Sequence, residues 1–402
     1  MLGLNPDPAQ AQLPIATGQE NQALLNEPVD ISRDFRNFSN TYFTADSLVS
    51  FNPATGEGTI QWQRNVYQTR QAFNNMLAFL RPIAGNEFPG VEYEANPVLP
   101  FYLEFVSPKT VRIRVKTGFE AQPEQASLML VNGFAPTDNS WKYSKIEKGH
   151  QYTGAFGSVV IRAYPWHIEF YDARGKLLTQ TNHNLDNAGT FTPIVPFSFV
   201  RRSSDYSRSV DAVFSLSSGE KIFGLGESFK GFDKRGQKVV LWTDDANGVQ
   251  NETMYKPIPF FMSNRGYGMF MHTSTPITCD IGKYFDAVNS LMIGDEALDL
   301  FVFLGNPKDI LDEYTDLTGK APMPPLWSFG LWMSRITYFS EADGRNVAAQ
   351  LRKNRIPCDV IHFDTGWFEH DWRSDYKFSV SRFTDPEKMI ADLDALGLKT
   401  CL

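Results

Sequence analysis

Cysteine and histidine are scarce in this chain of 402 residues, which has three of the first and six of the second. Cys279, Cys358 and Cys401 are widely spaced and odd in number, so no disulfide framework or zinc-binding spacing is visible. The histidines form no H-x-x-x-H or comparable ligand set. We therefore expect no metal and no cofactor.

Long apolar runs and an excess of positive charge are absent as well. No apolar run approaches the roughly 18 residues that cross a bilayer, so no membrane span is expected. The first 20 residues lack the basic and apolar stretches of a signal peptide, so we expect a cytoplasmic protein. The formal net charge of −8 argues against nucleic acid or an anionic membrane as the main partner.

Aromatic residues, at 14% of the chain, are plentiful. Ring faces pack well on the apolar C–H faces of sugars, and an aromatic excess is therefore typical of sugar-binding clefts. The same rings also suit the core of a large β-sandwich. For any single ring the two explanations are about equally good.

Residues 31–318 carry the pattern of an antiparallel β-sandwich. Residues 1–30, rich in Gln, Asn, Ala and Pro, predict a loose tail before it. Short apolar or alternating runs, separated by polar turns such as 172–175, predict many strands and few helices. The clearest of these runs are 111–115, 158–162, 167–171, 212–216 and 300–304.

Residues 319–402 change to an α/β pattern after the proline cluster at 321–325. The apolar run 326–333 predicts a strand buried on both faces, followed by a helix capped by Ser340. A second strand is expected at 358–364, then a helix capped by Asp385, then a strand from residue 398. Such alternation predicts parallel βαβ units. Three strands cannot close a (β/α)₈ barrel, which takes about 250 residues, so we expect a truncated barrel; a small open sheet is the alternative.

Asp364 is the first candidate for a functional residue, because parallel sheets place active sites at the carboxyl ends of their strands. A carboxylate there accepts hydrogen bonds from sugar hydroxyls, although a loop cap or an ion pair explains it equally well. Trp367 and Trp372 in the following loop suit either sugar stacking or packing. The segment 334–339 reaches the same face, and acids at 244–245 are ordinary turn residues or binding groups. No carboxylate pair of the kind that glycosidases need stands out in residues 319–402.

Several segments in order resemble glycoside hydrolase family 31. They are Phe223–Glu227, Tyr255–Phe260, Asn264–Gly268, the barrel entry Pro325–Trp332, the strand His362–Asp364 with Trp367, and Phe383–Pro386. The barrel entry and the strand resemble the α-xylosidase branch especially. In Phe383–Pro386, Thr384 stands in place of the first proline of the family's F-P-D-P. The resemblance runs from about residue 100 to Leu402.

The resemblance implies a galactose-mutarotase-like β-sandwich followed by a catalytic (β/α)₈ barrel. It implies a retaining α-glycosidase acting on an oligosaccharide or small glycoside, most favourably an α-xyloside. Its two catalytic aspartates would fall beyond Leu402, so no catalytic residue is assigned here. By motif, Asp364 resembles the aspartate that holds the sugar in subsite −1, Tyr338 lines that pocket, and Asp245 resembles a sandwich-loop aspartate near the leaving-group sugar.

Other functions remain open at this point. An α-glucosidase or an α-glucan lyase of the same family is one alternative, and a carbohydrate-binding protein without catalysis is another. A homo-oligomer is possible. We expect the chain alone to be inactive.

Overall fold

The computed structural model describes residues 29–72, 75–83, 96–118, 124–183, 196–243, 254, 256–370 and 373–402. The tail predicted over residues 1–30 therefore lies almost wholly outside the described residues. The chain divides into two compact units, Met1–Gly319 and Lys320–Leu402, here called the sandwich unit and the barrel unit. None of the described helices is both long and apolar enough to cross a membrane.

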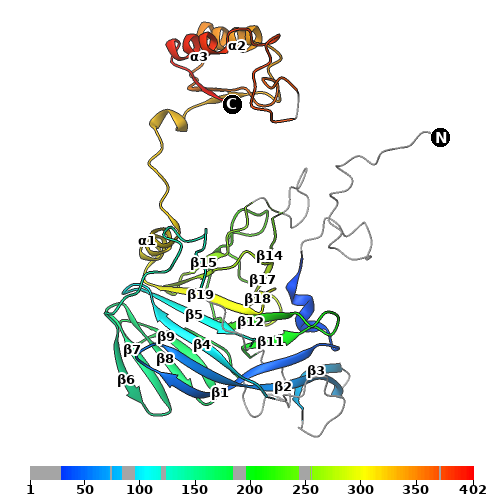
Figure 1. Cartoon of the computed structure of the whole chain (residues 1–402), viewed down its shortest axis with the longest axis vertical. Helices are drawn as coiled ribbons and strands as arrows, with labels where there is room; N and C mark the ends of the chain where they lie inside the picture. The colour runs from blue at the N-terminus through cyan, green and yellow to red at the C-terminus, as the bar shows by residue number, and fades with distance from the viewer. Residues whose placement is uncertain are drawn as a thin grey trace, which may run out of the picture. The chain divides into compact units, whose positions relative to one another are not determined.

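The sandwich unit contains a large antiparallel sheet (Figure 1). Its strand order is β13 (Ile222–Gly224), β15 (Phe260–Ser263), β16 (Tyr267–Met271), β19 (Ala297–Leu304), β5 (Thr110–Lys116), β4 (Val98–Phe105), β2 (Glu57–Ala72), β1 (Thr41–Asn52), β11 (Ser198–Arg201), β12 (Arg208–Ser215), β18 (Val288–Ile293), β17 (Ile277–Ile281) and β14 (Gln237–Leu241). A further strand, β3 (Asn75–Pro82), pairs with β2.

A second antiparallel sheet packs on the first. Its order is β10 (Leu177–Gln180), β9 (Trp166–Asp172), β8 (Gly157–Ala163), β7 (Gly149–Thr153) and β6 (Lys142–Ile146). Side chains from both sheets share one buried core, in which the ring of Trp166 lies 5.9 Å from that of Phe101. This confirms the predicted sandwich, and each of the five runs singled out in the sequence overlaps a strand.

The α-helix α1 (Pro307–Thr318) covers part of the outer face of the large sheet. Asn306 caps it: its side chain accepts hydrogen bonds from the backbone N–H groups of Lys308 and Asp309, and the Asp309 carboxylate accepts one from the Asn306 N–H. Because α1 lies on one side and the core on the other, every residue of β16 is buried. A short 3₁₀ helix, η4 (Ile31–Arg36), packs separately against Val200 and Met292.

The barrel unit is built on three parallel strands, in the order β20 (Trp332–Ser334), β21 (Val360–His362) and β22 (Lys399–Cys401). Between them run α2 (Glu341–Lys353) and α3 (Pro386–Ala395), which lie side by side (Figure 1). Ser340 and Asp385 cap these helices as predicted, each accepting a backbone N–H from the first turn. The unit is thus a βαβαβ series, as expected for the first strands of a (β/α)₈ barrel.

The prediction for residues 326–333 was wrong in its detail. Leu326–Phe329 form a 3₁₀ helix, η5, and only Trp332–Ser334 are a strand. The run is not buried on both faces: the side chains of Leu326 and Phe329 are 88% and 74% exposed. A parallel strand is buried on both sides only where two layers cover it, and the buried cluster of this unit lies between the strands and their two helices.

Candidate functional site

Asp364 lies in the loop that follows β21, at the carboxyl end of the parallel strands. Its backbone has φ of 48°, the left-handed region that Asp tolerates better than most residues. An isolated antiparallel bridge to Thr337 fixes its position beside the loop that follows β20. The Asp364 side chain is partly exposed. Within the described ranges its carboxylate makes no hydrogen bond or ion pair, so its lone pairs are available to a ligand.

The loops after β20 and β21 are joined tightly to each other. The hydroxyls of Thr337 and Thr365 are 3.0 Å apart. A Cβ atom on Gly366 would lie 2.7 Å from both the Thr337 Oγ1 and the Tyr338 carbonyl oxygen. Real Cβ contacts are longer than this, so the close approach of the two loops requires glycine at position 366. The pairing holds the Asp364 backbone in place.

Tyr338 is fully buried beneath this edge. Its ring packs 5.1 Å from that of Phe363, and its hydroxyl donates to the Met333 carbonyl oxygen at 3.2 Å. Burial raises the pKa of Tyr338, with Arg335 opposing the effect and Asp343 adding to it. The residue suggested as a pocket wall therefore presents no surface to a ligand in this structure, and supports the loop from below.

Trp367 is also buried, at 5% exposure. Its ring lies 4.3 Å from Phe368 and 4.8 Å from Phe378. Neither face is open for stacking on a sugar. Its indole N–H has no hydrogen-bond partner among the described residues, which is unusual for a buried donor. Asp245 and Trp372 lie outside the described residues.

Two further polar side chains lie at the same edge and were not predicted as site residues from the sequence. Arg335 follows β20 directly; it forms a 3.5 Å ion pair with Asp343 and lies over the Tyr338 ring. His362 ends β21, and its Nδ1 is 3.4 Å from the Ser334 hydroxyl of the neighbouring strand. The signal was their position: like Asp364, they stand at the carboxyl ends of parallel strands.

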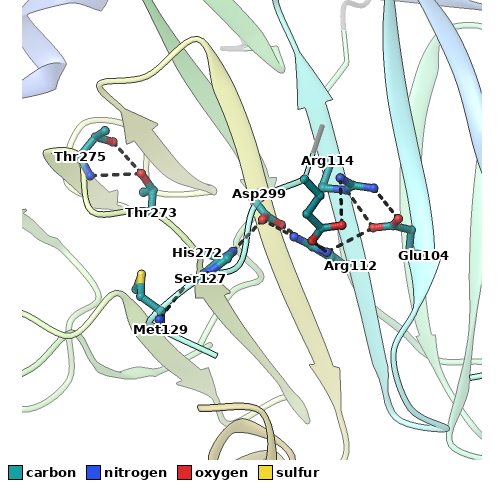
Figure 2. Close-up of polar contacts among 10 residues, drawn as sticks. Glu104, Arg112, Arg114, Ser127, Met129, His272, Thr273, Thr275 and Asp299 are labelled. Atoms are coloured by element: carbon teal, nitrogen blue, oxygen red, sulfur yellow. Dashed lines mark hydrogen bonds and ion pairs between the residues drawn. The ribbon is translucent and has the colours of Figure 1, made fainter. Parts of the chain in front are cut away.

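The sandwich unit contains a second polar cluster, on the face of β5 turned away from the core (Figure 2). Strict alternation in β5 places Val111, Ile113 and Val115 in the core and leaves two arginines on the other face. Arg112 binds both carboxylate oxygens of Asp299, at 2.8 and 2.7 Å. Arg114 likewise binds both oxygens of Glu104.

Behind Asp299 the cluster continues to His272 and Ser127 (Figure 2). His272 Nδ1 is 2.7 Å from Asp299, and His272 Nε2 is 2.7 Å from the Ser127 hydroxyl. Burial opposes ionisation of Asp299, but hydrogen bonds from Arg112 and His272 outweigh it and hold the pKa of Asp299 below its usual value. This row of hydrogen-bonded side chains has the residue types of a Ser-His-Asp triad, but the bidentate contact with Arg112 already neutralises the charge of Asp299. We assign it a structural role, which fixes Arg112.

Among the described residues, no group of three or more His, Cys, Asp and Glu side chains is arranged to hold a metal ion. The side chains at the two sites offer charge and hydrogen-bonding groups. At Asp364 the free carboxylate accepts hydrogen bonds from hydroxyl groups, and beside Arg112 several carboxylates and a guanidinium lie together.

Comparison with known proteins agrees with this architecture. Residues 100–280 match the glycosyl hydrolase 31 N-terminal galactose mutarotase-like domain, and residues 321–402 match the glycosyl hydrolases family 31 TIM-barrel domain. The chain belongs to glycoside hydrolase family 31. Asp364 thus lies in the TIM-barrel domain of a family 31 protein, and the Arg112 cluster in its mutarotase-like domain.

The relatives of this family 31 chain include α-xylosidases and α-glucosidases. It is 37% identical over 191 residues to an α-xylosidase of Emericella nidulans, covering 47% of this chain and 24% of the relative. It is 30% identical to an α-xylosidase of Saccharolobus solfataricus, covering 75% of this chain and 39% of the relative. The chain thus matches about a quarter to two fifths of the length of these relatives.

A family 31 dextranase of Flavobacterium johnsoniae, solved with isomaltotriose, shares the fold with a TM-score of 0.67. The sequences are 22% identical, and the match covers 89% of this chain and 38% of the dextranase. The likeness concerns the fold alone.

Proposed function

We propose that this chain is the front part of a retaining α-glycosidase that hydrolyses terminal α-linked sugars, most favourably α-xylosides. Its substrate is an oligosaccharide or a small glycoside. The observation that carries the proposal is the carboxylate of Asp364, which has no hydrogen-bond or ion-pair partner among the described residues and follows a parallel strand in a family 31 barrel domain. Barrel enzymes place their active sites at that end of the strands.

In this proposal Asp364 accepts hydrogen bonds from hydroxyls of the terminal sugar. Tyr338 and Trp367 act from beneath: they pack against Phe363 and Phe368 and hold the loop that carries the carboxylate. Asp245 is proposed to reach the leaving-group sugar, as the family resemblance implies. The arrangement recognises substrate and does not by itself break the bond.

Cleavage with retention needs two carboxyl groups about 5–5.5 Å apart, one as nucleophile and one as acid/base. We propose that sequence after Leu402 supplies both. The 402-residue chain alone is then expected to give no turnover of an aryl α-glycoside. Turnover well above the uncatalysed rate would overturn that part of the proposal.

The proposed preference for α-xylosides rests on Gly366, which has no side chain to bind the extra hydroxyl group of glucose. Glucose differs from xylose by a CH₂OH group on C5, and a site that buries this hydroxyl without a partner loses affinity. Many family 31 α-glucosidases have Asp-x-Asp at the end of this strand, whereas here the sequence is Asp364-Thr365-Gly366. Because a Cβ at 366 meets the neighbouring loop, this backbone does not accommodate a second acid there.

The test is a matched assay of the protein translated from the complete reading frame that contains this chain. We expect a higher kcat/KM on p-nitrophenyl α-xyloside than on p-nitrophenyl α-glucoside. An equal or higher value on the glucoside would reject the xyloside preference and leave an α-glucosidase, which the similarity to α-glucosidase 2 of Bacillus thermoamyloliquefaciens favours as second candidate. Binding of sugar without turnover of either glycoside would instead support a non-catalytic binding protein.

A further inference from the structure

The sandwich unit contains a pocket of about 400 Å³, a size typical of small-molecule sites. It lies beside the Arg112 cluster. Its lining includes three charged and three aromatic residues that a ligand could contact: Glu104, Arg112, Glu124, Trp141, Tyr143 and Tyr152. They come from β4, β5, β6, β7 and the segments before them, so the pocket lies wholly within one unit.

The polar side of the pocket is rigid and rich in acceptors. The Arg112 side chain is 4% exposed and is held from behind by Asp299, while its Nη1 contacts Glu124 at 2.6 Å. Glu104 and Glu124 are about one third exposed, and each carboxylate has room for more hydrogen bonds than its arginine partners supply. Acceptors therefore outnumber free donors, which favours a ligand with several hydroxyl groups.

The other side of the pocket is aromatic, and its polar atoms are already used. The Trp141 indole N–H donates to the Ser107 carbonyl oxygen at 2.9 Å, and the Tyr152 hydroxyl donates to the Pro53 carbonyl oxygen at 2.8 Å. What these residues leave to the pocket is apolar surface. Tyr143 is 40% exposed, so its ring is accessible to a ligand. Aromatic surface opposite hydrogen-bonding groups matches the two-sided chemistry of a sugar.

The charged residues that line the pocket are one arginine, Arg112, and three acids, Glu104, Glu124 and Asp138. Arg112 is already paired with Asp299 and Glu124. Such a wall repels a free anion, whereas its carboxylates accept hydrogen bonds from the hydroxyl groups of a neutral polyhydroxyl compound. We propose that this pocket of the sandwich unit is a saccharide-binding site whose affinity does not depend on Asp364 or on any catalytic step.

The test is calorimetric titration of the 402-residue chain with isomaltotriose and with xylose, using Tyr143→Ala and Glu124→Gln. Both side chains are partly exposed, so these variants should keep the wild-type melting temperature. We expect Kd to rise at least tenfold in Tyr143→Ala and at least threefold in Glu124→Gln. Tyr164→Ala is the matched control, since this tyrosine is 59% exposed and absent from the pocket lining; its Kd should equal the wild-type value.

Asp364→Ala separates this site from the proposed active site. Binding that persists in Asp364→Ala and weakens in Tyr143→Ala supports the pocket, whether or not the glycosidase assay succeeds. Binding lost in Asp364→Ala and unchanged in Tyr143→Ala would overturn it, as would no binding of either sugar at millimolar concentration. Displacement of the sugar by Ca²⁺, with Ca²⁺ affinity lost in Glu124→Gln, would also overturn it by making the pocket a cation site.

Discussion

The sandwich unit and the barrel unit differ in how far their apolar side chains are buried. In the sandwich two sheets cover each other, and Trp62 and Trp166 are fully buried between them. In the barrel unit the helix side is buried, but the apolar run that leads into β20 leaves Leu326, Phe329 and Trp332 exposed. The difference teaches that an apolar run predicts burial only where a second layer is present to cover it.

The strongest test of this contrast replaces one tryptophan in each unit by alanine. Trp166→Ala removes a buried ring from between the sheets and should lower the free energy of unfolding by about 3–5 kcal/mol. Trp332 is 42% exposed, and Trp332→Ala should cost within about 0.5 kcal/mol. Urea unfolding followed by far-UV circular dichroism measures both. Equal losses in the two variants would contradict the contrast.

A buried acid, Asp211, gives a second test of burial in the sandwich unit. Asp211 in β12 is almost fully buried, and burial raises the pKa of Asp211 to about 8 against a hydrogen bond from Ser290, with Asp280 adding to the rise. The folded state then holds a proton that the unfolded chain releases above its ordinary pKa. The contribution of Asp211 to stability is therefore full at acidic pH, falls as pH rises toward about 8, and is level above that value.

The expected slope from Asp211 is roughly 1.4 kcal/mol per pH unit well below the folded pKa, and it falls off near pH 8, so the loss between pH 6 and pH 8 is about 2 kcal/mol. Asp211→Asn has no carboxylate to ionise and should lose this part of the slope. The measurement is urea unfolding of both proteins at several pH values in this window. Parallel pH profiles for the two would show that Asp211 is ionised in the folded state at neutral pH.

Gly366 tests the joint between the two loops of the barrel unit. In Gly366→Ala the new Cβ would be 2.7 Å from the Tyr338 carbonyl oxygen, so the loops must separate, at a cost of about 1–3 kcal/mol. Gly118→Ala is the control, because its Cβ would meet nothing closer than 3.8 Å. Thermal unfolding compares them. A Gly366→Ala protein as stable as Gly118→Ala would mean that the close approach is absent.

The smallest expected effect is at a helix cap. Ser340 accepts the Asp343 N–H at 3.2 Å, and Ser340→Ala should destabilise α2 by about 1 kcal/mol. Ser340→Asp keeps an acceptor and should restore most of the loss. Amide exchange in the first turn of α2 follows this locally. Equal amide exchange rates in Ser340→Ala and the wild type would show that the Ser340 side chain does not stabilise the start of α2.

Much of the fold could be predicted because local chemistry decides it. Alternation in 111–115 gave β5, and the caps at Ser340 and Asp385 gave the starts of two helices. The course of 326–333 could not be predicted in this way, since it depends on what covers the run. At the candidate site the sequence predicted the position of Asp364 after a parallel strand. It did not predict the burial of Tyr338 and Trp367, because the sequence pattern of an aromatic residue is the same whether the ring packs in the core or binds a ligand. The pocket beside Arg112 joins residues far apart in sequence, and no local pattern marks it.

The most direct test of the central claim is Asp364→Ala in the protein of the complete reading frame. Asp359→Ala, an acid just before β21 in the same unit, is the control. A charged hydrogen bond is worth about 1.5–3 kcal/mol, so we expect kcat/KM on an α-xyloside to fall on the order of ten- to a hundredfold in Asp364→Ala and little in the control. A change under about twofold in a folded Asp364→Ala protein would contradict the claim that this carboxylate holds the substrate.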